Sequence, residues 1–281
     1  MKVYEIITNQ VIAALEAGTI PWRRPWAVTE QKNLVSKREY SGMNAILLAM
    51  RDRSTPYWLT YKQCQELGGT VKKGEKAAQV VFYKRYAPEE EKDKPEKEQK
   101  LVWVLRYYNV FNLDQCEGLK APEQGEPFNP IEKAEELVKG YANGPEIKHG
   151  SQQASYSPKQ DVIAMPNKET FDSAEDYYAT LFHEMTHSTG HESRLNRKDA
   201  TVAIRFGSES YSKEELVAEM GAAFLTATAG IRNASVAGNE AAYIAGWISK
   251  LQNDKTLVIK AAGQAQKAVN YIKGVEVGVA A

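Results

Sequence analysis

The sequence is poor in cysteine and carries no net charge. Its 281 residues include two cysteines, Cys64 and Cys116, and 36 basic side chains offset 36 acidic ones. Two isolated cysteines exclude a disulfide-rich scaffold and a CxxC zinc ribbon or redox site. The neutral balance excludes a chain-wide attraction to nucleic acid or to membranes, so any charged binding surface must be local.

Long hydrophobic runs are missing as well. No window approaches the ~18 uncharged apolar residues that a membrane-spanning helix needs, and Glu5 and Glu16 interrupt the segment in which a signal peptide would be apolar. We therefore expect a cytoplasmic protein that has no membrane partner. The apolar content of 43% is typical of a globular protein, and the length predicts two domains or one large one.

A polar segment with several prolines and glycines, residues 114–130, marks the predicted domain boundary. The predicted domains are residues 1–125 and 126–281. Because no internal repeat is present, we expect each domain to have its own fold.

The first domain has the pattern of a mixed α+β fold. Residues 78–86 and 101–111 are β-branched and aromatic, as strands prefer. They flank the charged segment 88–100, which predicts two antiparallel strands joined by a solvated loop. Residues 2–17 have the apolar spacing of a helix.

The most specific motif is His183-Glu-Met-Thr-His187, which lies in a helix-compatible stretch. A spacing of four residues places both imidazoles on one helix face, where their nitrogens can converge on a single metal ion. Glu184 can then reach the water molecule that the metal activates, which is the position of a general base. The sequence thus predicts a catalytic metal site of the zinc type.

A catalytic zinc site usually has a third protein ligand. His191 continues the spacing of four, but an unbroken helix would place it about 12 Å along the axis from His183, too far to share an ion. Ser193 stands where a metzincin would have its third histidine. Neither position supplies the third ligand.

The alternative is a glutamate from a following helix, which we expect to begin at Ser212. Glu215 is the favoured ligand, with Glu219 and then Glu214 as alternatives. If Glu215 binds the metal, Glu219 can accept a hydrogen bond from a ligand histidine. Glu215 could instead complete a capping box with Ser212.

Residues 154–166 predict a short hairpin directly before the metal-binding helix. A hairpin, a metal-binding helix and a glutamate-bearing helix, in that order, are typical of a zincin core. The edge strand of such a core can bind an extended peptide by β-augmentation, which favours peptide hydrolysis.

Aromatic and basic residues alternate in the first domain, a composition that can grip single-stranded nucleic acid through stacking and phosphate contacts. The same aromatic residues could instead form the core of a strand-rich domain. The candidate DNA-binding residues are Trp22, Arg23, Arg24, Trp26, Tyr83, Lys84, Arg85 and Tyr86.

Taken together, the motifs resemble the ArdC-type antirestriction proteins of plasmids and other mobile elements, whose N-terminal domain is shared with TraC-type primases. The resemblance rests on residues 20–26, 40–44, 57–60, 156–158, 165–166, 183–191, 193–197 and 243–247.

The resemblance implies an N-terminal single-stranded-DNA-binding domain followed by a zincin-like metallopeptidase domain, which together protect incoming DNA from host restriction. The metal motif predicts a bound Zn²⁺, or another divalent transition metal such as Mn²⁺ or Co²⁺. The expected partners are single-stranded DNA and a protein substrate or restriction enzyme. The alternatives are a DNA-binding module whose metal is structural only and a metallopeptidase that does not bind DNA.

Overall fold

The computed structural model describes residues 2–22, 30–87, 100–122, 129–197, 209–231 and 240–275. Its contacts group the chain into two units. Unit 1 comprises residues 1–10 and 31–122, and unit 2 comprises residues 11–30 and 123–281. The sequence predicts one domain boundary, after residue 125. The contacts instead assign residues 11–30, which lie within the predicted first domain, to unit 2.

Unit 1 is built on a four-stranded sheet in the order β1-β2-β5-β4. The strands β4 and β5 form a long antiparallel hairpin, as the sequence predicted, while β1 and β2 are parallel. A two-stranded ribbon of β3 and β6 and three short helical segments complete the unit. The strand bounds are β1 Lys32–Asn33, β2 Tyr57–Leu59, β3 Thr70–Val71, β4 Ala78–Tyr86, β5 Val102–Asn112 and β6 Cys116–Glu117.

Two of the helical segments of unit 1, α3 and η2, begin where local side chains satisfy their first backbone amides, whereas α2 begins at Gly42 without a side-chain cap. Thr60 and Gln63 form a reciprocal capping box at α3, and Asn112 caps a 3-10 turn in the same way. The bounds are α2 Met43–Ala49, α3 Tyr61–Glu66 and the 3-10 helix η2 Leu113–Gln115; α1, Lys2–Glu16, contributes its first nine described residues to unit 1 and the rest to unit 2.

The core of unit 1 lies against the base of the β4–β5 hairpin. One cluster surrounds the fully buried Trp58 and includes Leu48, Val80 and Val110. A second cluster contains both cysteines, which are buried and not joined by a disulfide. The distal half of the hairpin extends beyond these clusters, and most of its side chains are exposed.

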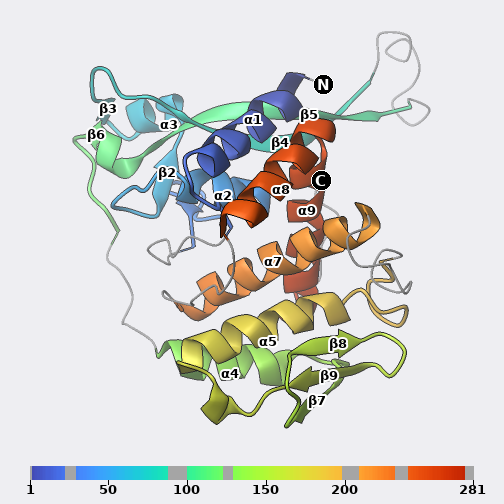
Figure 1. Cartoon of the computed structure of the whole chain (residues 1–281). Coiled ribbons are helices and arrows are strands. Elements are labelled where there is room, and N and C mark those ends of the chain that lie inside the picture. The colour runs from blue at the N-terminus through green and yellow to red at the C-terminus, as the bar shows by residue number, and fades with distance from the viewer. Residues whose placement is uncertain are drawn as a thin grey trace. The chain divides into compact units, whose positions relative to one another are not determined.

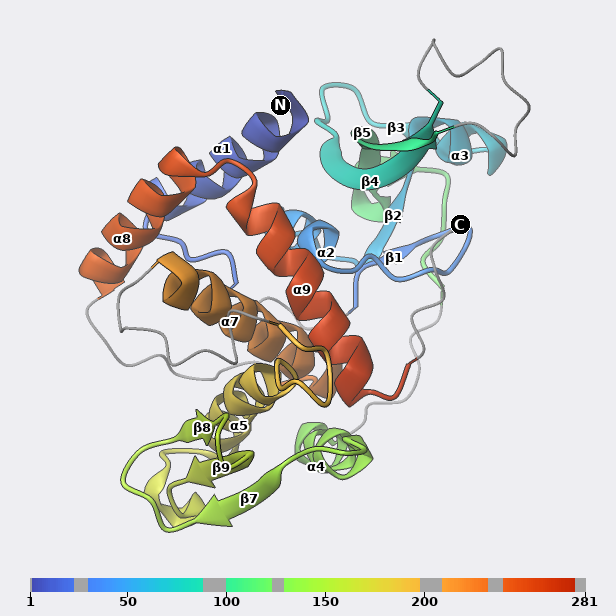
Figure 2. The ribbon, with the colours of Figure 1, turned by 90° about the vertical axis from the view of Figure 1, so that its right-hand side faces the viewer.

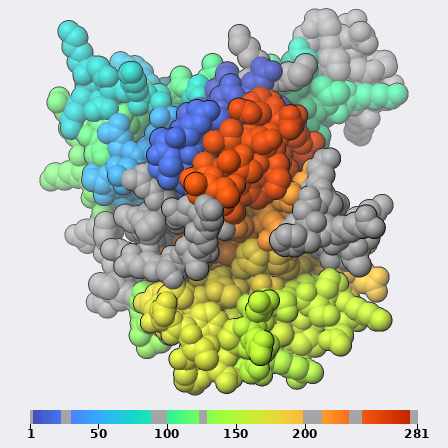
Figure 3. Space-filling view, in the orientation of Figure 1, coloured from blue at the N-terminus to red at the C-terminus, as the bar shows by residue number. Residues whose placement is uncertain are grey.

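Unit 2 is a stack of helices on a three-stranded sheet in the order β7-β9-β8 (Figure 1). The helix α5 packs on the sheet and on α7, and α9 also packs on α7, which it crosses obliquely in Figure 2. The yellow-green atoms in the lower part of the space-filling view belong to these strands and the loops between them (Figure 3). The bounds are α4 Pro130–Gly140, β7 Glu146–His149, β8 Ser155–Ser157, β9 Val162–Met165, η3 Lys168–Thr170, α5 Ala174–Ser188, α7 Glu209–Ala229, α8 Glu240–Asn253 and α9 Leu257–Ile272.

The predicted hairpin before the metal-binding helix is confirmed as β8 and β9, which pair antiparallel. In contrast, α7 begins at Glu209 rather than at Ser212. Ser212 therefore lies inside the helix, and a capping box between Ser212 and Glu215 is excluded. No helix in the described part of the chain is both long and apolar enough to span a membrane.

A glycine sets the distance between α5 and α7. A Cβ atom added at Gly221 would lie 2.4 Å from Cγ2 of Thr186, whereas real carbon atoms do not approach that closely. Thr186 is fully buried, and its hydroxyl donates to the Phe182 carbonyl oxygen at 2.7 Å. The two helices therefore cross in close contact at this pair, with Thr186 directly before His187 and about one turn after His183.

We expect Gly221→Ala to destabilise the protein by about 1–3 kcal/mol, because the added methyl group must push Thr186 or α7 away. The matched control is Gly263→Ala in α9, where an added Cβ meets nothing within 4 Å. That variant should be neutral or gain up to about 1 kcal/mol of helix propensity. Urea unfolding of both variants checks this, and equal effects would contradict the close crossing.

Candidate metal centre

The helix that carries the two motif histidines is capped at its start. The Ser173 hydroxyl accepts a hydrogen bond from the Asp176 amide at 3.1 Å, and two acidic residues in the first turn suit the positive end of the helix dipole. One turn apart on α5, His183 and His187 bring their Nε2 atoms to 3.1 Å. The imidazoles thus converge as the spacing predicted.

Glu215 reaches the same point from α7. One of its carboxylate oxygens lies 3.7 Å from His183 Nε2 and the other lies 3.4 Å from His187 Nε2. In the described ranges, these three residues form the one group of metal-type donors, with ligand atoms within 4.8 Å of one another. The favoured set of the sequence analysis is therefore brought together, and its binding of a metal remains a prediction.

The donor set fits a divalent transition metal. Two ligand atoms on a tetrahedral zinc ion, at 2.0–2.1 Å from it, lie about 3.3 Å apart, which is close to the distances of this cluster. Imidazole and carboxylate ligands are those that zinc, manganese and cobalt accept. Burial would lower the pKa of His187, but hydrogen bonds that its ring donates to the carboxylates of Glu214 and Glu215 raise it to about 10. The carboxylates of Glu214 and Glu215 therefore favour a positive charge at His187.

Glu184 lies beside this cluster without belonging to it. Its side chain is buried, and burial is the main cause that raises the pKa of its carboxyl group. The nearby Glu215 raises that pKa further, while His187 and a hydrogen bond from the backbone amide of Tyr156 oppose the shift. A carboxylate with a raised pKa, near the ligands but separate from them, suits the general base that the motif predicts.

The edge strand β8 is fixed against the end of α5 by Arg194. Its guanidinium donates to the Ser188 carbonyl oxygen at 2.7 Å, to Asp161 Oδ2 at 3.0 Å and to the Tyr156 hydroxyl at 3.1 Å. The hydrogen bond from Arg194 is the first cause that lowers the pKa of Asp161. Tyr156 therefore stands in a fixed position relative to Glu184.

Glu214, the last of the three ligand candidates from the sequence, lies behind His187, a place that its sequence position did not predict. Glu214 Oε1 lies 3.4 Å from His187 Nδ1, on the side of the ring away from the cluster. A partner at Nδ1 fixes the ring and leaves Nε2 to face a metal. Glu219, to which the sequence analysis gave this kind of role, is half-buried one turn further along α7, and its part stays a prediction.

Glu214 is held by Arg197, a buried residue of the segment after α5. Arg197 donates to Oε1 and Oε2 of Glu214 at 2.6 and 3.1 Å, and also to the Thr186 carbonyl oxygen at 2.8 Å. Burial raises the pKa of Glu214, but hydrogen bonds from His187 and Arg197 outweigh it, and the net shift is downward. Glu214 thus stays ionised behind the ligand histidine.

We expect Arg197→Gln to weaken metal binding by about 10- to 100-fold, the usual range for outer-shell partners, because Glu214 would lose its bidentate partner. Glu214→Gln should bind metal more tightly than Glu214→Ala, since its amide oxygen can still accept from Nδ1. Competition with a chromophoric chelator measures all three variants. Wild-type affinity in Arg197→Gln and Glu214→Ala would exclude this role.

His191 stands apart from the cluster, although no continuous helix carries it away as the prediction assumed, because α5 ends at Ser188 and His191 lies in the segment that follows. It is half-exposed, and its Nδ1 lies 2.8 Å from the Ser193 hydroxyl. It therefore provides a natural comparison for the two histidines of the cluster.

The candidate DNA-binding residues divide into three groups. On β4, Tyr83, Lys84, Arg85 and Tyr86 are exposed. Arg23, Arg24 and Trp26 lie outside the described residues. The prediction that Trp22 binds DNA is wrong. Its side chain is 3% exposed and packs edge-on against Trp247, with 5.9 Å between the ring centres. Its indole nitrogen donates to the Tyr243 hydroxyl at 3.1 Å. A buried tryptophan in unit 2 cannot offer a face to a base.

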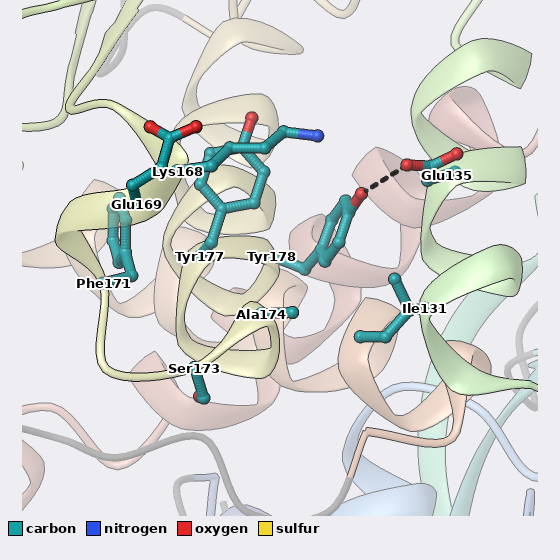
Figure 4. A pocket seen from close by; sticks show the side chains of 9 residues that line it. All are labelled: Ile131, Glu135, Lys168, Glu169, Phe171, Ser173, Ala174, Tyr177 and Tyr178. Carbon is teal, nitrogen blue, oxygen red and sulfur yellow. Dashed lines mark hydrogen bonds between the residues drawn. The ribbon is translucent and has the colours of Figure 1, made fainter.

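A cavity of about 400 Å³ lies at the start of α5, away from the metal cluster (Figure 4). Lys168 lies over the rings of Tyr177 and Tyr178, and the Tyr178 hydroxyl donates to Glu135 at 3.1 Å. None of the cluster residues lines it. We assign this open depression no part in the metal site.

Comparison with known proteins identifies the family. Residues 1–111 match the model of the N-terminal domain of the anti-restriction factor ArdC, and residues 132–264 match that of a zincin-like metallopeptidase. Crystal structures of the antirestriction protein ArdC of plasmid R388, metal-free and Mn(II)-bound, are 37% identical to this chain, with TM-scores of 0.78 and 0.77. These matches cover 97% and 98% of both chains, respectively. The chain belongs to the ArdC-type antirestriction family.

Other relatives of this ArdC-type chain are longer. Two DNA primases TraC of Escherichia coli are 36% and 35% identical over 97% of this chain, which spans 20% and 27% of their lengths. The protein y4eC of Sinorhizobium fredii is 35% identical, and the match covers 96% of this chain and 91% of that protein. The family assignment confirms the α+β architecture with an ArdC N-terminal domain and a zincin-like domain. The Mn(II)-bound structure of this relative, together with the zincin-like domain, supports a divalent metal.

Proposed function

We propose that this chain is an antirestriction protein that binds single-stranded DNA through unit 1 and hydrolyses peptide bonds at a metal site in unit 2, so that incoming DNA is protected from host restriction. The observation that carries the enzymatic half is the convergence of His183, His187 and Glu215 beside the buried Glu184. We propose Zn²⁺ as the metal, with Mn²⁺ or Co²⁺ able to replace it.

In the proposed reaction, the metal supplies Lewis-acid chemistry when it is bound. The two histidines and Glu215 hold it, and Glu184 takes the proton of the attacking water on a carboxylate oxygen and later gives it to the leaving amine. The buried position of Glu184 raises the pKa of its carboxyl group, so it holds the proton that it accepts more firmly than an exposed carboxylate would before it returns the proton to the leaving amine.

The edge strand β8 is the place where an extended peptide substrate could pair with the sheet. Strand β8 pairs with β9 on one side only, and Tyr156 at its centre contacts Glu184 through its backbone amide. An extended peptide that adds to this edge would place its backbone beside Glu184. We therefore propose a protein substrate with an extended segment, such as a restriction enzyme.

The DNA half of the proposal rests on the distal hairpin of β4 and β5. Eight of the large hydrophobic residues that are exposed in the described chain lie in or next to its strands, and basic residues alternate with them. They are Phe82, Tyr83, Tyr86, Leu101, Val102, Trp103, Tyr107 and Tyr108. Exposed aromatic faces between cations suit the stacked bases and phosphates of a single strand, and one of the two faces of the hairpin is enough to bind it.

The full chain tests both halves together. We expect it to bind an oligo(dT) strand with an affinity that falls steeply as salt rises, by a log–log slope of about −0.7 for each phosphate contacted, and to cleave a denatured protein only after metal is added. Fluorescence anisotropy and gel electrophoresis provide the measurements. DNA binding without cleavage favours the module with a structural metal, and cleavage without DNA binding favours the simple metallopeptidase.

A further inference from the structure

The register of the β4–β5 hairpin sorts its exposed side chains onto two faces. The strands pair without interruption from Ala78↔Val110 to Tyr86↔Val102, and residues two apart in a strand share a face. We call one face the Phe82 face, which carries Phe82, Lys84, Tyr86, Arg106 and Tyr108. The other, the Tyr83 face, carries Tyr83, Arg85, Trp103 and Tyr107.

The Tyr83 face is already used within unit 1. The Tyr4 and Tyr83 hydroxyl groups, one on α1 and one on β4, lie 2.8 Å apart. Nearer the base of the hairpin, Gln10 of α1 donates to Gln79 at 2.8 Å. The guanidinium of Arg85 lies 4.8 Å from the centre of the Trp103 ring, so the one cation of this face is stacked on one of its aromatic rings.

The Phe82 face offers three aromatic rings and two cations. Phe82 and Tyr108 meet edge to face at 5.8 Å, and both side chains are 45% exposed. Tyr86, 42% exposed, lies further along the same face. Lys84 lies between Phe82 and Tyr86 on β4, while Arg106 is paired with Phe82 across the ladder. Neither cation forms an ion pair with a residue in the described ranges.

The spacing on this face suits a polynucleotide. Four residues separate Phe82 from Tyr86, which is about 13 Å of strand, or roughly two nucleotides. Bases can stack on the rings at either end while Lys84, which lies between the rings, and Arg106, which lies opposite Phe82, meet the phosphates. A negatively charged backbone complements the two cations, and no carboxylate belongs to this face.

We propose that single-stranded DNA lies along the Phe82 face, with its bases on Phe82, Tyr86 and Tyr108 and its phosphates on Lys84 and Arg106. The inference rests on the proposed DNA binding of unit 1 and adds where the strand lies. Within the segment Tyr83-Lys-Arg-Tyr86, only Lys84 and Tyr86 contact the DNA in this arrangement, whereas Tyr83 and Arg85 lie on the opposite face.

The experiment compares two double variants of the full chain that remove two exposed aromatic rings from opposite faces. Phe82→Ala with Tyr108→Ala alters the Phe82 face, and Trp103→Ala with Tyr107→Ala is the control. Anisotropy with labelled oligo(dT) should show a loss of about 30-fold or more for the first, since each stacked base accounts for about a 5- to 150-fold change in affinity. The control should lose less than about three-fold.

A second pair of variants tests the cations. Lys84→Gln with Arg106→Gln should reduce the salt slope by about 1.4, because two phosphate contacts are removed, whereas Arg85→Gln should leave it unchanged. Circular dichroism checks that every variant is folded. If the Tyr83-face variant loses as much affinity as the Phe82-face variant, or if the latter binds like wild type, the inference is overturned while DNA binding stands. If the wild-type chain does not bind oligo(dT), the proposed function itself fails.

Discussion

Glu184→Gln keeps its metal and loses peptide hydrolysis by about 10²- to 10⁴-fold. The expected loss follows from the removal of a general base, and the retained metal follows from the geometry, because Glu184 is not among the three converging donors. A glutamine has nearly the same shape and can still accept the hydrogen bond from the Tyr156 amide. Cleavage of a denatured protein and metal analysis of the purified variant give the two readings.

The matched control is Glu192→Gln, an exposed carboxylate after the end of α5. It should cleave like wild type. If Glu184→Gln retains full cleavage, Glu184 is not the base. If the variant loses cleavage but still protects DNA from restriction, the metal site has another purpose and the DNA-binding module becomes the better account.

His183→Ala should lose most of its metal, to below about a tenth of the wild-type content after dialysis. Removing one of three protein ligands leaves an imidazole and a carboxylate, which do not complete a transition-metal site. Elemental analysis for zinc and manganese measures the stoichiometry. The expected secondary effect is a lower melting temperature in the presence of metal, because a bound ion stabilises only the folded state.

The control for this experiment is His191→Ala. This histidine belongs to the same His-rich stretch, but it contacts Ser193 and not the cluster. Its variant should bind metal as the wild type does. Equal losses in both variants, or an undiminished metal content in His183→Ala, would exclude the proposed ligand set.

Local features of the chain could be predicted from the sequence because their causes lie within a few residues. The capping box of Thr60 and Gln63 starts α3, and the turn between β8 and β9 follows from its own polar residues. The convergence of His183 and His187 needs only the helix period. Each of these features depends on neighbours that a short window of sequence contains.

The features that sequence reasoning missed depend on distant residues. Glu214 and Glu215 are adjacent glutamates on α7, and only the crossing of α7 with α5 decides which one faces the cluster and which one lies behind His187. Arg197 follows a helix and reads as a solvated cation, yet it is buried because Glu214 and the end of α5 surround it. Trp22 was misassigned for the same reason, since its partners Tyr243 and Trp247 lie more than two hundred positions away.

The route of the polypeptide between the two units has an evolutionary consequence. Residues 1–10 belong to one unit, 11–30 to the other, 31–122 to the first again, and the remainder to the second. No single recombination point can therefore deliver either unit intact, and a gene fusion that takes only the first 122 codons would carry away Ile20 and Trp22, two buried residues of the other unit. Inheritance as one block is the simplest outcome, and the TraC primases, which match 97% of this chain inside much longer proteins, retain it in that form.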